Sequence, residues 1–162
     1  VGIFNVILTH LNILGEGISW LGNIHTARWA VILESIWKGT PFVMIFILAA
    51  LQTVPPELYE SARVDGASRT AMFFRIPLPM IKEPVAIATI LTTIGTINNF
   101  NAVWLMTQGG PLGTTEIMYT YAYRRAFTTY EFGEAAAISA IMFGLIAGLT
   151  FLYTRLIEEK EN

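Results

Sequence analysis

The sequence predicts an all-α membrane protein with three transmembrane helices, on the basis of its composition and its charge-free stretches. Of the 162 residues, 54% are hydrophobic and 14% are charged, whereas an average soluble domain has about 25% charged residues. The mean hydropathy is +0.54. A helix needs about 20 mainly apolar residues to cross a hydrocarbon core, and three stretches meet this need. The alternative, a soluble all-α protein, would require shorter core helices with a polar face.

The three expected spans are residues 27–54, 84–106 and 134–156. The last contains twenty consecutive uncharged residues, Ala135 to Thr154. The second ends before a Gly-Gly-Pro sequence that forces a turn. In the first, Pro41 is expected to kink the helix, because proline removes a backbone hydrogen bond. The chain is therefore expected to pass through the membrane more than once.

Lysine and arginine are retained on the cytoplasmic side of short loops, and their distribution predicts the orientation. Six lie in or next to residues 55–83 and the tail 157–162, and three lie on the other side, at Arg28, Arg124 and Arg125. The tenth, Lys38, lies within the first expected span. We therefore expect these two segments to be cytoplasmic, and residues 1–26 and 107–133 to lie at the outer surface. Because the chain opens on Val1 and lacks a signal-peptide pattern, we interpret it as the C-terminal part of a longer protein.

Several functions are disfavoured by composition. A net charge of −2 provides no basic field for nucleic acid, so no nucleic-acid partner is expected. The chain contains no cysteine, and His10 and His25 are fifteen residues apart without a companion cluster, so no metal site is predicted. The catalytic motifs G-x-S-x-G and H-E-x-x-H are absent. We therefore predict that the chain is not an enzyme.

Residues 55–83 predict a helix–turn–helix at the membrane surface. The pair Pro55-Pro56 can begin a helix that continues to about Val64. Gly66 tolerates the left-handed conformation that ends a helix, and Ser68 can cap a second short helix. The segment has more apolar residues than a solvated connector needs, which favours a protein partner. These residues are Leu58, Tyr59, Ala62, Met72, Phe73 and Phe74.

A family resemblance becomes specific in this loop. The spacing of Glu60, Ala62, Gly66, Ile76 and Pro79 resembles the EAA motif, E-A-A, three residues, G, nine residues, I, two residues, P. This motif is typical of the membrane subunits of binding-protein-dependent ABC importers. Ser61 stands where the second alanine is usual, and Pro77 is an additional proline. Taken alone, Glu60 and Gly66 each also have a purely structural explanation. Glu60 can be a negative charge that favours the start of a helix, and Gly66 can be the residue that ends it.

The resemblance implies a type I ABC importer permease fold, in which this loop is a coupling helix that docks on a cytoplasmic ATPase. It implies ATPase-coupling roles for Glu60, Ala62, Asp65, Gly66, Ala67, Ile76 and Pro79. The sequence has no G-x-x-x-x-G-K-[ST] pattern, so a partner ATPase dimer would hydrolyse ATP and this chain would bind no cofactor. Residues 1–162 would then form the C-terminal part of a single transmembrane domain.

A second block, residues 100–143, resembles sugar-importer permeases of the maltose and glycerol-3-phosphate type. Its Leu105–Pro111 run, LMTQGGP, carries much of this likeness, and Asn101 replaces an aspartate that is frequent in the subgroup. The resemblance implies a bacterial or archaeal cytoplasmic membrane protein that forms part of the path of an ATP-driven sugar importer. The implied partners are a second permease subunit, an external sugar-binding protein, the sugar and membrane lipid.

Asn98, Asn99 and Asn101 are the candidate substrate-path residues. A buried amide without a partner costs several kcal/mol in hydrocarbon, so these side chains should face water or other helices. One interpretation is sugar binding, aided by the rings of Phe100 or Trp104, because residues matching Asn98 and Asn99 touch the sugar in maltose-type relatives. The other is interhelical hydrogen bonding.

Two further patterns complete the predictions. Small residues recur every four positions in the last span, which predicts close helix packing; they are Ala136, Ala140, Gly144 and Gly148.

The alternative function is an ion-driven secondary transporter or channel subunit, and it is disfavoured because Glu34 and Lys38 are expected to pair with each other. An intramembrane enzyme is the third alternative, and it has the least support.

Overall fold

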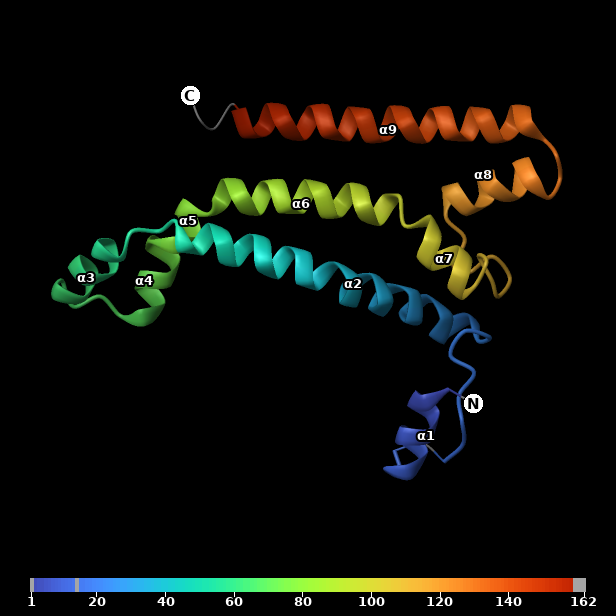
Figure 1. Cartoon of the computed structure of the whole chain (residues 1–162), viewed down its shortest axis with the longest axis horizontal. Coiled ribbons are helices and arrows are strands. Elements are labelled where there is room, and N and C mark those ends of the chain that lie inside the picture. Colours follow the sequence, from blue (N-terminus) through green and yellow to red (C-terminus); the bar gives the residue numbers. More distant parts are fainter. Residues whose placement is uncertain (1, 14, 159–162) are drawn as a thin grey trace. The chain divides into compact units, whose positions relative to one another are not determined.

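The computed structural model describes residues 2–13 and 15–158, and within these ranges the chain is helical without a strand (Figure 1). The predicted all-α class is therefore confirmed. The helices are α1 (Ile3–His10), α2 (Ile24–Gln52), α3 (Pro56–Val64), α4 (Arg69–Arg75), α5 (Pro77–Met80), α6 (Lys82–Ile97), α7 (Phe100–Met106), α8 (Met118–Phe127) and α9 (Phe132–Glu158).

The chain divides into two compact units. The first comprises residues 1–34 and 100–135, and therefore holds α1, the start of α2, α7, α8 and the first residues of α9. The second comprises residues 35–99 and 136–162, and holds the rest of α2, the helices α3 to α6, and most of α9.

Two helices in the described part are long and apolar enough to cross a membrane. These are α2, with 29 residues, and α9 from Phe132 to Arg155, with 24 residues. They correspond to the expected spans 27–54 and 134–156. Pro41 lies inside α2, as the sequence requires. A third crossing is possible by length and composition if the bent pair Arg69–Met80 and Lys82–Ile97 forms one broken span, with 65° between its two parts.

The stretch 84–106, expected as one span, contains two helices instead of one. Helix α6 ends at Ile97, and α7 begins at Phe100. At about 1.5 Å per residue, the 16 residues of α6 measure about 24 Å, which is shorter than the hydrocarbon core of about 30 Å. The break falls on Asn98 and Asn99, whose amide side chains compete with helical backbone hydrogen bonds.

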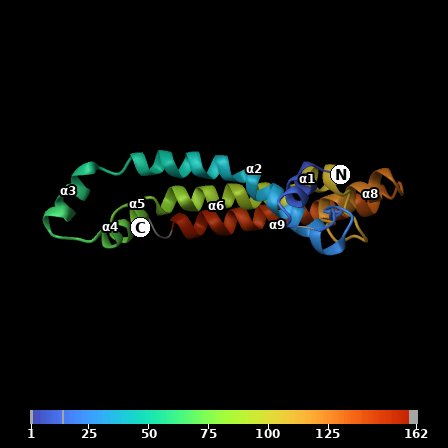
Figure 2. The ribbon, with the colours of Figure 1, turned by 90° about the horizontal axis from the view of Figure 1, so that it is seen from below.

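The core of the second unit lies where α2 ends and α6 begins. Ala50, Val54 and Ile81 are buried there, and Tyr59 and Ile76 from the loop pack against them. This cluster anchors α3 and α4 to the ends of the long helices. Both views show the α3–α4 segment projecting beyond the ends of α2 and α6 (Figures 1 and 2).

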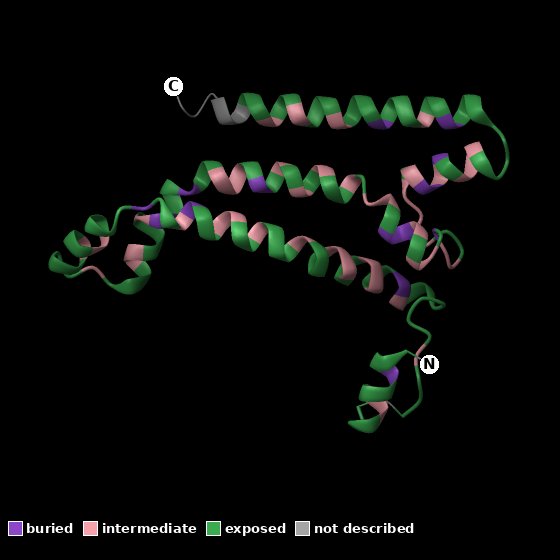
Figure 3. Cartoon of the chain, in the orientation of Figure 1, coloured by how far each residue is buried: buried purple, intermediate pink, exposed green. Residues whose placement is uncertain are grey.

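Most residues of the long helices are exposed (Figure 3), and many of these exposed residues are large and hydrophobic. Trp37 on α2 is 79% exposed and Phe143 on α9 is 75% exposed. The residues of α2 that are turned inward recur at helical spacing, as at Ser35, Gly39 and Val43. Exposed aromatic rings along helices of this length suit a lipid environment rather than water.

Candidate functional site

The α3–α4 loop has the local structure that its sequence predicts. Helix α3 begins directly after the N-cap Pro55 and ends at Val64. Gly66 has a φ of +74°, and the Ala67 N–H donates to the Ala62 carbonyl at 2.9 Å, which closes the helix end. The Ser68 hydroxyl accepts a hydrogen bond from the Ala71 N–H at 3.2 Å and caps α4. These predicted turns and caps are confirmed.

The residues of the EAA-like motif divide into an exposed group and an anchor. Glu60, Asp65, Gly66 and Pro79 are exposed, and Ala62 and Ala67 are half-buried. Ile76 packs in the core of the second unit. The motif therefore combines one apolar contact inside the chain with a surface that is open at the α3–α4 turn.

Gly66 is required by the backbone rather than by its neighbours. A Cβ atom built at Gly66 would meet nothing within 4 Å, whereas its positive φ is strained for most side chains. The position thus presents bare backbone at an exposed turn. Such a surface allows another molecule to approach closely, which a larger side chain would prevent.

The three asparagines at the α6–α7 junction have different environments. The Asn99 amide donates to the Ser35 hydroxyl of α2 at 2.8 Å, so it joins two elements of the second unit. Asn98 is exposed at the C-cap of α6, and within residues 2–13 and 15–158 its side chain has no hydrogen-bond partner. Asn101 is exposed on α7. The structure therefore gives Asn99 a packing contact and leaves the amides of Asn98 and Asn101 accessible.

Four aromatic rings from α7 and α8 form a continuous row, which we call the aromatic ladder. Phe100 stacks on Trp104 with 5.6 Å between ring centroids, Trp104 contacts Tyr123 at 4.6 Å, and Tyr123 contacts Phe127 at 4.8 Å. The sequence analysis considered the first two rings for sugar binding, whereas Tyr123 and Phe127 entered only as part of the family pattern of residues 100–143. Their i, i+4 spacing on one helix was the available signal.

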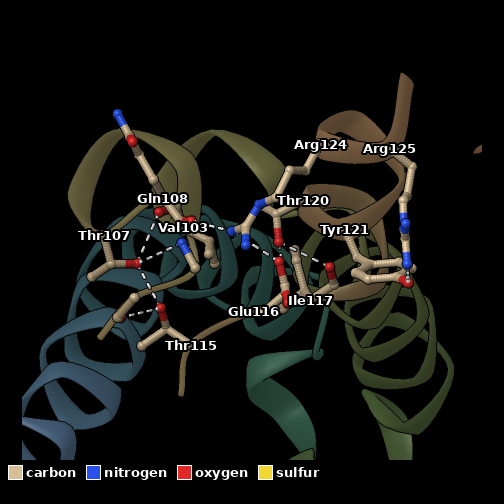
Figure 4. Close-up of polar contacts among 12 residues, drawn as sticks. Val103, Thr107, Gln108, Thr115, Glu116, Ile117, Thr120, Tyr121, Arg124 and Arg125 are labelled. Atoms are coloured by element: carbon tan, nitrogen blue, oxygen red, sulfur yellow. Dashed lines mark hydrogen bonds and ion pairs between the residues drawn. The ribbon is translucent and has the colours of Figure 1, made fainter. Parts of the chain in front are cut away.

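The Gly-Gly-Pro turn is held by a polar network that the sequence analysis did not find (Figure 4). Arg124 of α8 donates to the Gln108 carbonyl at 2.8 Å and forms an ion pair with Glu116 at 2.9 Å. Gly109 has a φ of +87°, and a Cβ there would lie 3.0 Å from an Arg124 nitrogen. The glycine is therefore needed both for the backbone and for the approach of the arginine. The Thr107 and Thr115 hydroxyls close the turn with a hydrogen bond of 2.6 Å.

A second arginine, Arg125, connects α8 to the start of α9 within the first unit. Its guanidinium donates to the Tyr121 hydroxyl at 2.6 Å and 2.9 Å and to a Glu131 carboxylate oxygen at 2.6 Å, and it lies 3.4 Å from Glu134. The hydrogen bond to Tyr121, with the charges of both glutamates, raises the pKa of Arg125 above its ordinary value. The arginine thus stays charged, and its contacts with Tyr121, Glu131 and Glu134 stabilise the α8–α9 turn.

The small residues of α9 lie on a side that the described chain does not cover. All four are exposed; they are Ala136, Ala140, Gly144 and Gly148. A Cβ at either glycine would meet nothing within 4 Å. The residues of α9 turned toward the chain are others, including Met142, which is buried. The predicted packing face is therefore open.

Two apolar helices of spanning length, α2 and α9, and an exposed helix–turn–helix that follows α2 are the features of a membrane subunit. The chain belongs to the family described as binding-protein-dependent transport system inner membrane component, whose model matches residues 1–161. This assignment confirms the predicted membrane location and the resemblance that the loop indicated.

Relatives of this chain include sugar permeases. It is 36% identical over 95% of its length to the trehalose/maltose transport system permease of Thermococcus litoralis, covering 51% of that protein. It is 40% identical over 83% of its length to a putative ABC transporter permease of a Caldicellulosiruptor strain, covering 99% of it. The crystal structure of a bacterial alginate ABC transporter, in complex with an alginate pentasaccharide-bound periplasmic protein, contains a chain of similar fold. Its TM-score is 0.84, with 26% identity over 96% of this chain and 54% of that one.

For most of these relatives, the match covers only part of the relative's own sequence. The chain spans about half the length of most of the curated relatives it matches. The chain is thus a permease family member whose relatives usually have further sequence.

Proposed function

We propose that the chain forms part of the translocation path of an ATP-driven sugar importer and couples this path to a separate ATPase through the α3–α4 loop. The observation that carries the proposal is the EAA-like spacing on an exposed turn. Gly66 presents bare backbone there, while Ile76 of the same motif packs in the core. A movement of the turn, caused by an ATPase bound to it, would therefore be transmitted through Ile76 to the ends of α2 and α6.

In this proposal residues 55–83 face the cytoplasm and dock on an ATPase dimer, which supplies the ATP hydrolysis. The contact residues would be Glu60, Ala62, Asp65, Gly66 and Ala67, with Ile76 and Pro79 positioning the loop. Residues 27–54, 84–106 and 134–156 would provide the membrane spans. The open face of α9 would pack against a second permease subunit or another helix of the complete protein.

The sugar path would include side chains from each of the two units. Asn98 and Asn101 have accessible amides that can both donate to and accept from sugar hydroxyls. In the first unit, the aromatic ladder begins at Phe100, which precedes Asn101 in the sequence, and offers flat surfaces on which sugar rings can stack. Asn99 would position this junction through Ser35 rather than touch the sugar. An external sugar-binding protein would deliver the solute, as the description of the family and the periplasmic protein in the alginate transporter structure suggest.

The proposal is tested by substituting Gly66 in the complete permease, co-expressed with its ATPase and partner permease. Gly66→Asn retains a residue that tolerates positive φ but adds a side chain at the docking turn. We expect the ATPase to co-purify with the native permease and to be lost, or strongly reduced, with the variant. Sugar uptake into proteoliposomes should fall in parallel.

Gly113→Asn is a matched control. Gly113 has a φ of +73°, close to that of Gly66, and a Cβ there would meet only ordinary contact at 3.9 Å. Because residues 107–133 are expected outside, this variant should keep the ATPase bound. Equal ATPase recovery from the Gly66→Asn variant and the native permease would reject the coupling role. Uptake that needs an ion gradient and no ATPase would favour a secondary transporter instead.

A further inference from the structure

Helix α1 buries a polar side chain and exposes apolar ones, which is the reverse of the pattern on a surface helix of a soluble protein. The side chain that it buries is polar Asn5, which is 7% exposed. The side chains that it exposes are apolar, with Ile3 and Phe4 each 71% exposed and Ile7 48% exposed. In water this arrangement would be unfavourable, since the transfer of apolar side chains from water into an apolar environment lowers the free energy. The helix therefore needs an apolar surrounding.

Asn5 fixes the orientation of this helix. Its amide donates to the Ile18 carbonyl at 2.7 Å, and its oxygen accepts from the Trp20 indole N–H at 2.7 Å and from the Ile18 N–H at 3.3 Å. A Cβ at Gly17 would lie 3.3 Å from the Asn5 amide nitrogen, so the loop approaches the asparagine closely. These bonds turn the polar side of α1 toward its own loop and the apolar side outward.

The same loop places α1 next to the end of a span. The Thr26 hydroxyl, in the first turn of α2, donates to the Trp20 carbonyl at 2.8 Å. Trp20 in turn donates to Asn5 of α1, so two hydrogen-bonded steps connect α1 to the beginning of α2. Exposed apolar residues then continue along α2, including Trp29 and Leu33. The apolar surface of α1 is thus linked to the lipid-facing surface of a membrane helix.

Length and charge favour lipid as the occupant. Eight residues measure about 12 Å, far less than the hydrocarbon thickness of about 30 Å, so α1 is too short to span. Residues 1–15 carry no Asp, Glu, Lys or Arg, so the segment offers no charge for a complementary protein surface. Trp20, partly exposed and hydrogen-bonded through its indole, is the amphipathic side chain typical of the membrane–water boundary.

We propose that α1 is an interfacial helix that lies in the membrane surface at the end of α2, with Ile3, Phe4 and Ile7 inserted among the lipid chains. Asn5 is its positioning residue, because it forms hydrogen bonds with polar groups of the loop at Ile18 and Trp20. Without these hydrogen bonds, the same groups would oppose insertion of the helix into the membrane surface. The occupant of this surface is the bilayer itself, through its acyl boundary rather than a specific headgroup. This inference goes beyond the transport role and does not depend on the nature of the solute.

The test is collision accessibility of nitroxide spin labels in the complete permease complex, reconstituted in phosphatidylethanolamine–phosphatidylglycerol vesicles. Labels are attached to single cysteines in the variants Phe4→Cys and Ile7→Cys, with Glu16→Cys as the control in the same segment. All three positions are exposed, so the labels fit without displacing the core. We expect the labels at positions 4 and 7 to collide more with oxygen, which partitions into lipid, than with a water-soluble nickel chelate. The label at position 16 should show the reverse.

Each other outcome overturns the proposal. A label at position 4 or 7 that collides mainly with the nickel chelate faces water. A label that collides with neither reagent is covered by protein, which would make α1 a packing element of the complete permease. Sugar uptake measured on the same labelled samples reports separately on the transport function, so a failure of one proposal is distinguishable from a failure of the other.

Discussion

Two neighbouring asparagines show how residues of one type acquire different roles at a helix break. Asn99 donates to Ser35 across two elements, and Asn98 ends α6 with an exposed amide. Hydrogen bonds between membrane helices contribute about 0.6 kcal/mol on average. Asn99 thus contributes to the stability of the junction, while the accessible amide of Asn98 remains available for a ligand.

This difference predicts that Asn99→Ala and Asn98→Ala separate stability from transport. We expect Asn99→Ala to lower the free energy of unfolding by about 0.6 kcal/mol because it removes the bond to Ser35. Asn98→Ala should change stability by less than about 0.5 kcal/mol, as is usual for exposed positions, and should lower sugar uptake. Unfolding in bicelles and uptake into proteoliposomes measure the two effects.

Ser35→Ala is the partner variant for a double-mutant cycle. If the bond accounts for the stability of the junction, the double variant Ser35→Ala, Asn99→Ala should be less destabilised than the sum of the single variants. Strict additivity would show that the two side chains do not interact in the membrane. Normal uptake by Asn98→Ala would remove that residue from the proposed path.

At the level of elements, the α3–α4 loop was predictable because its signals are local. Prolines, a glycine and a serine each act on the backbone within a few residues, and the observed α3 and α4 begin and end where those residues require. The core contact of Ile76 was not predictable in the same way, since it depends on α2 and α6, which are distant in sequence. The resemblance named Ile76 without giving its physical role.

Non-local contacts also explain what the sequence analysis missed. The break at Asn98 and Asn99 interrupts a stretch that carries no charge, and the Asn99 partner, Ser35, is 64 positions away. Arg124 and Glu116 can be read from the sequence as charges within residues 107–133, but their joint role at Gly109 depends on the turn geometry. Hydrophobic patterns identify long elements and give little information on the polar networks between them.

The cap of α4 leads to a prediction for this element. Ser68→Ala removes the side-chain acceptor of the Ala71 N–H, and the loss of such a cap costs about 1 kcal/mol. We expect amide hydrogen exchange in the first turn of α4 to become about fivefold faster, with exchange in α6 unchanged. Mass spectrometry of the purified complex measures both. Ser68→Asn is the conservative control, since asparagine also caps helices well; equal acceleration in both variants would contradict the capping role.

The whole chain raises the question of how many times it crosses the membrane. Both α2 and α9 have spanning length, whereas α6 ends after 16 residues and the next helix, α7, belongs to the other unit. If the stretch 84–106 crosses the membrane despite its break, the loops 55–83 and 107–133 lie on opposite sides. If it does not, both loops lie on the same side. The distribution of lysine and arginine favours the first arrangement.

Single cysteines at two highly exposed loop positions decide between these arrangements. Val64 is 88% exposed in the first loop and Leu112 is 90% exposed in the second, and the segment contains no cysteine of its own. With Val64→Cys and Leu112→Cys in an otherwise cysteine-free complete permease, a membrane-impermeant maleimide should label position 112 in intact cells. Position 64 should be labelled only after the cells are opened, and inside-out vesicles should reverse the pattern. Labelling of both positions from one side would leave α2 and α9 as the crossings of this segment. The α3–α4 turn and the Gly-Gly-Pro turn would then share a compartment, and an ATPase could not bind one while an external protein bound the other.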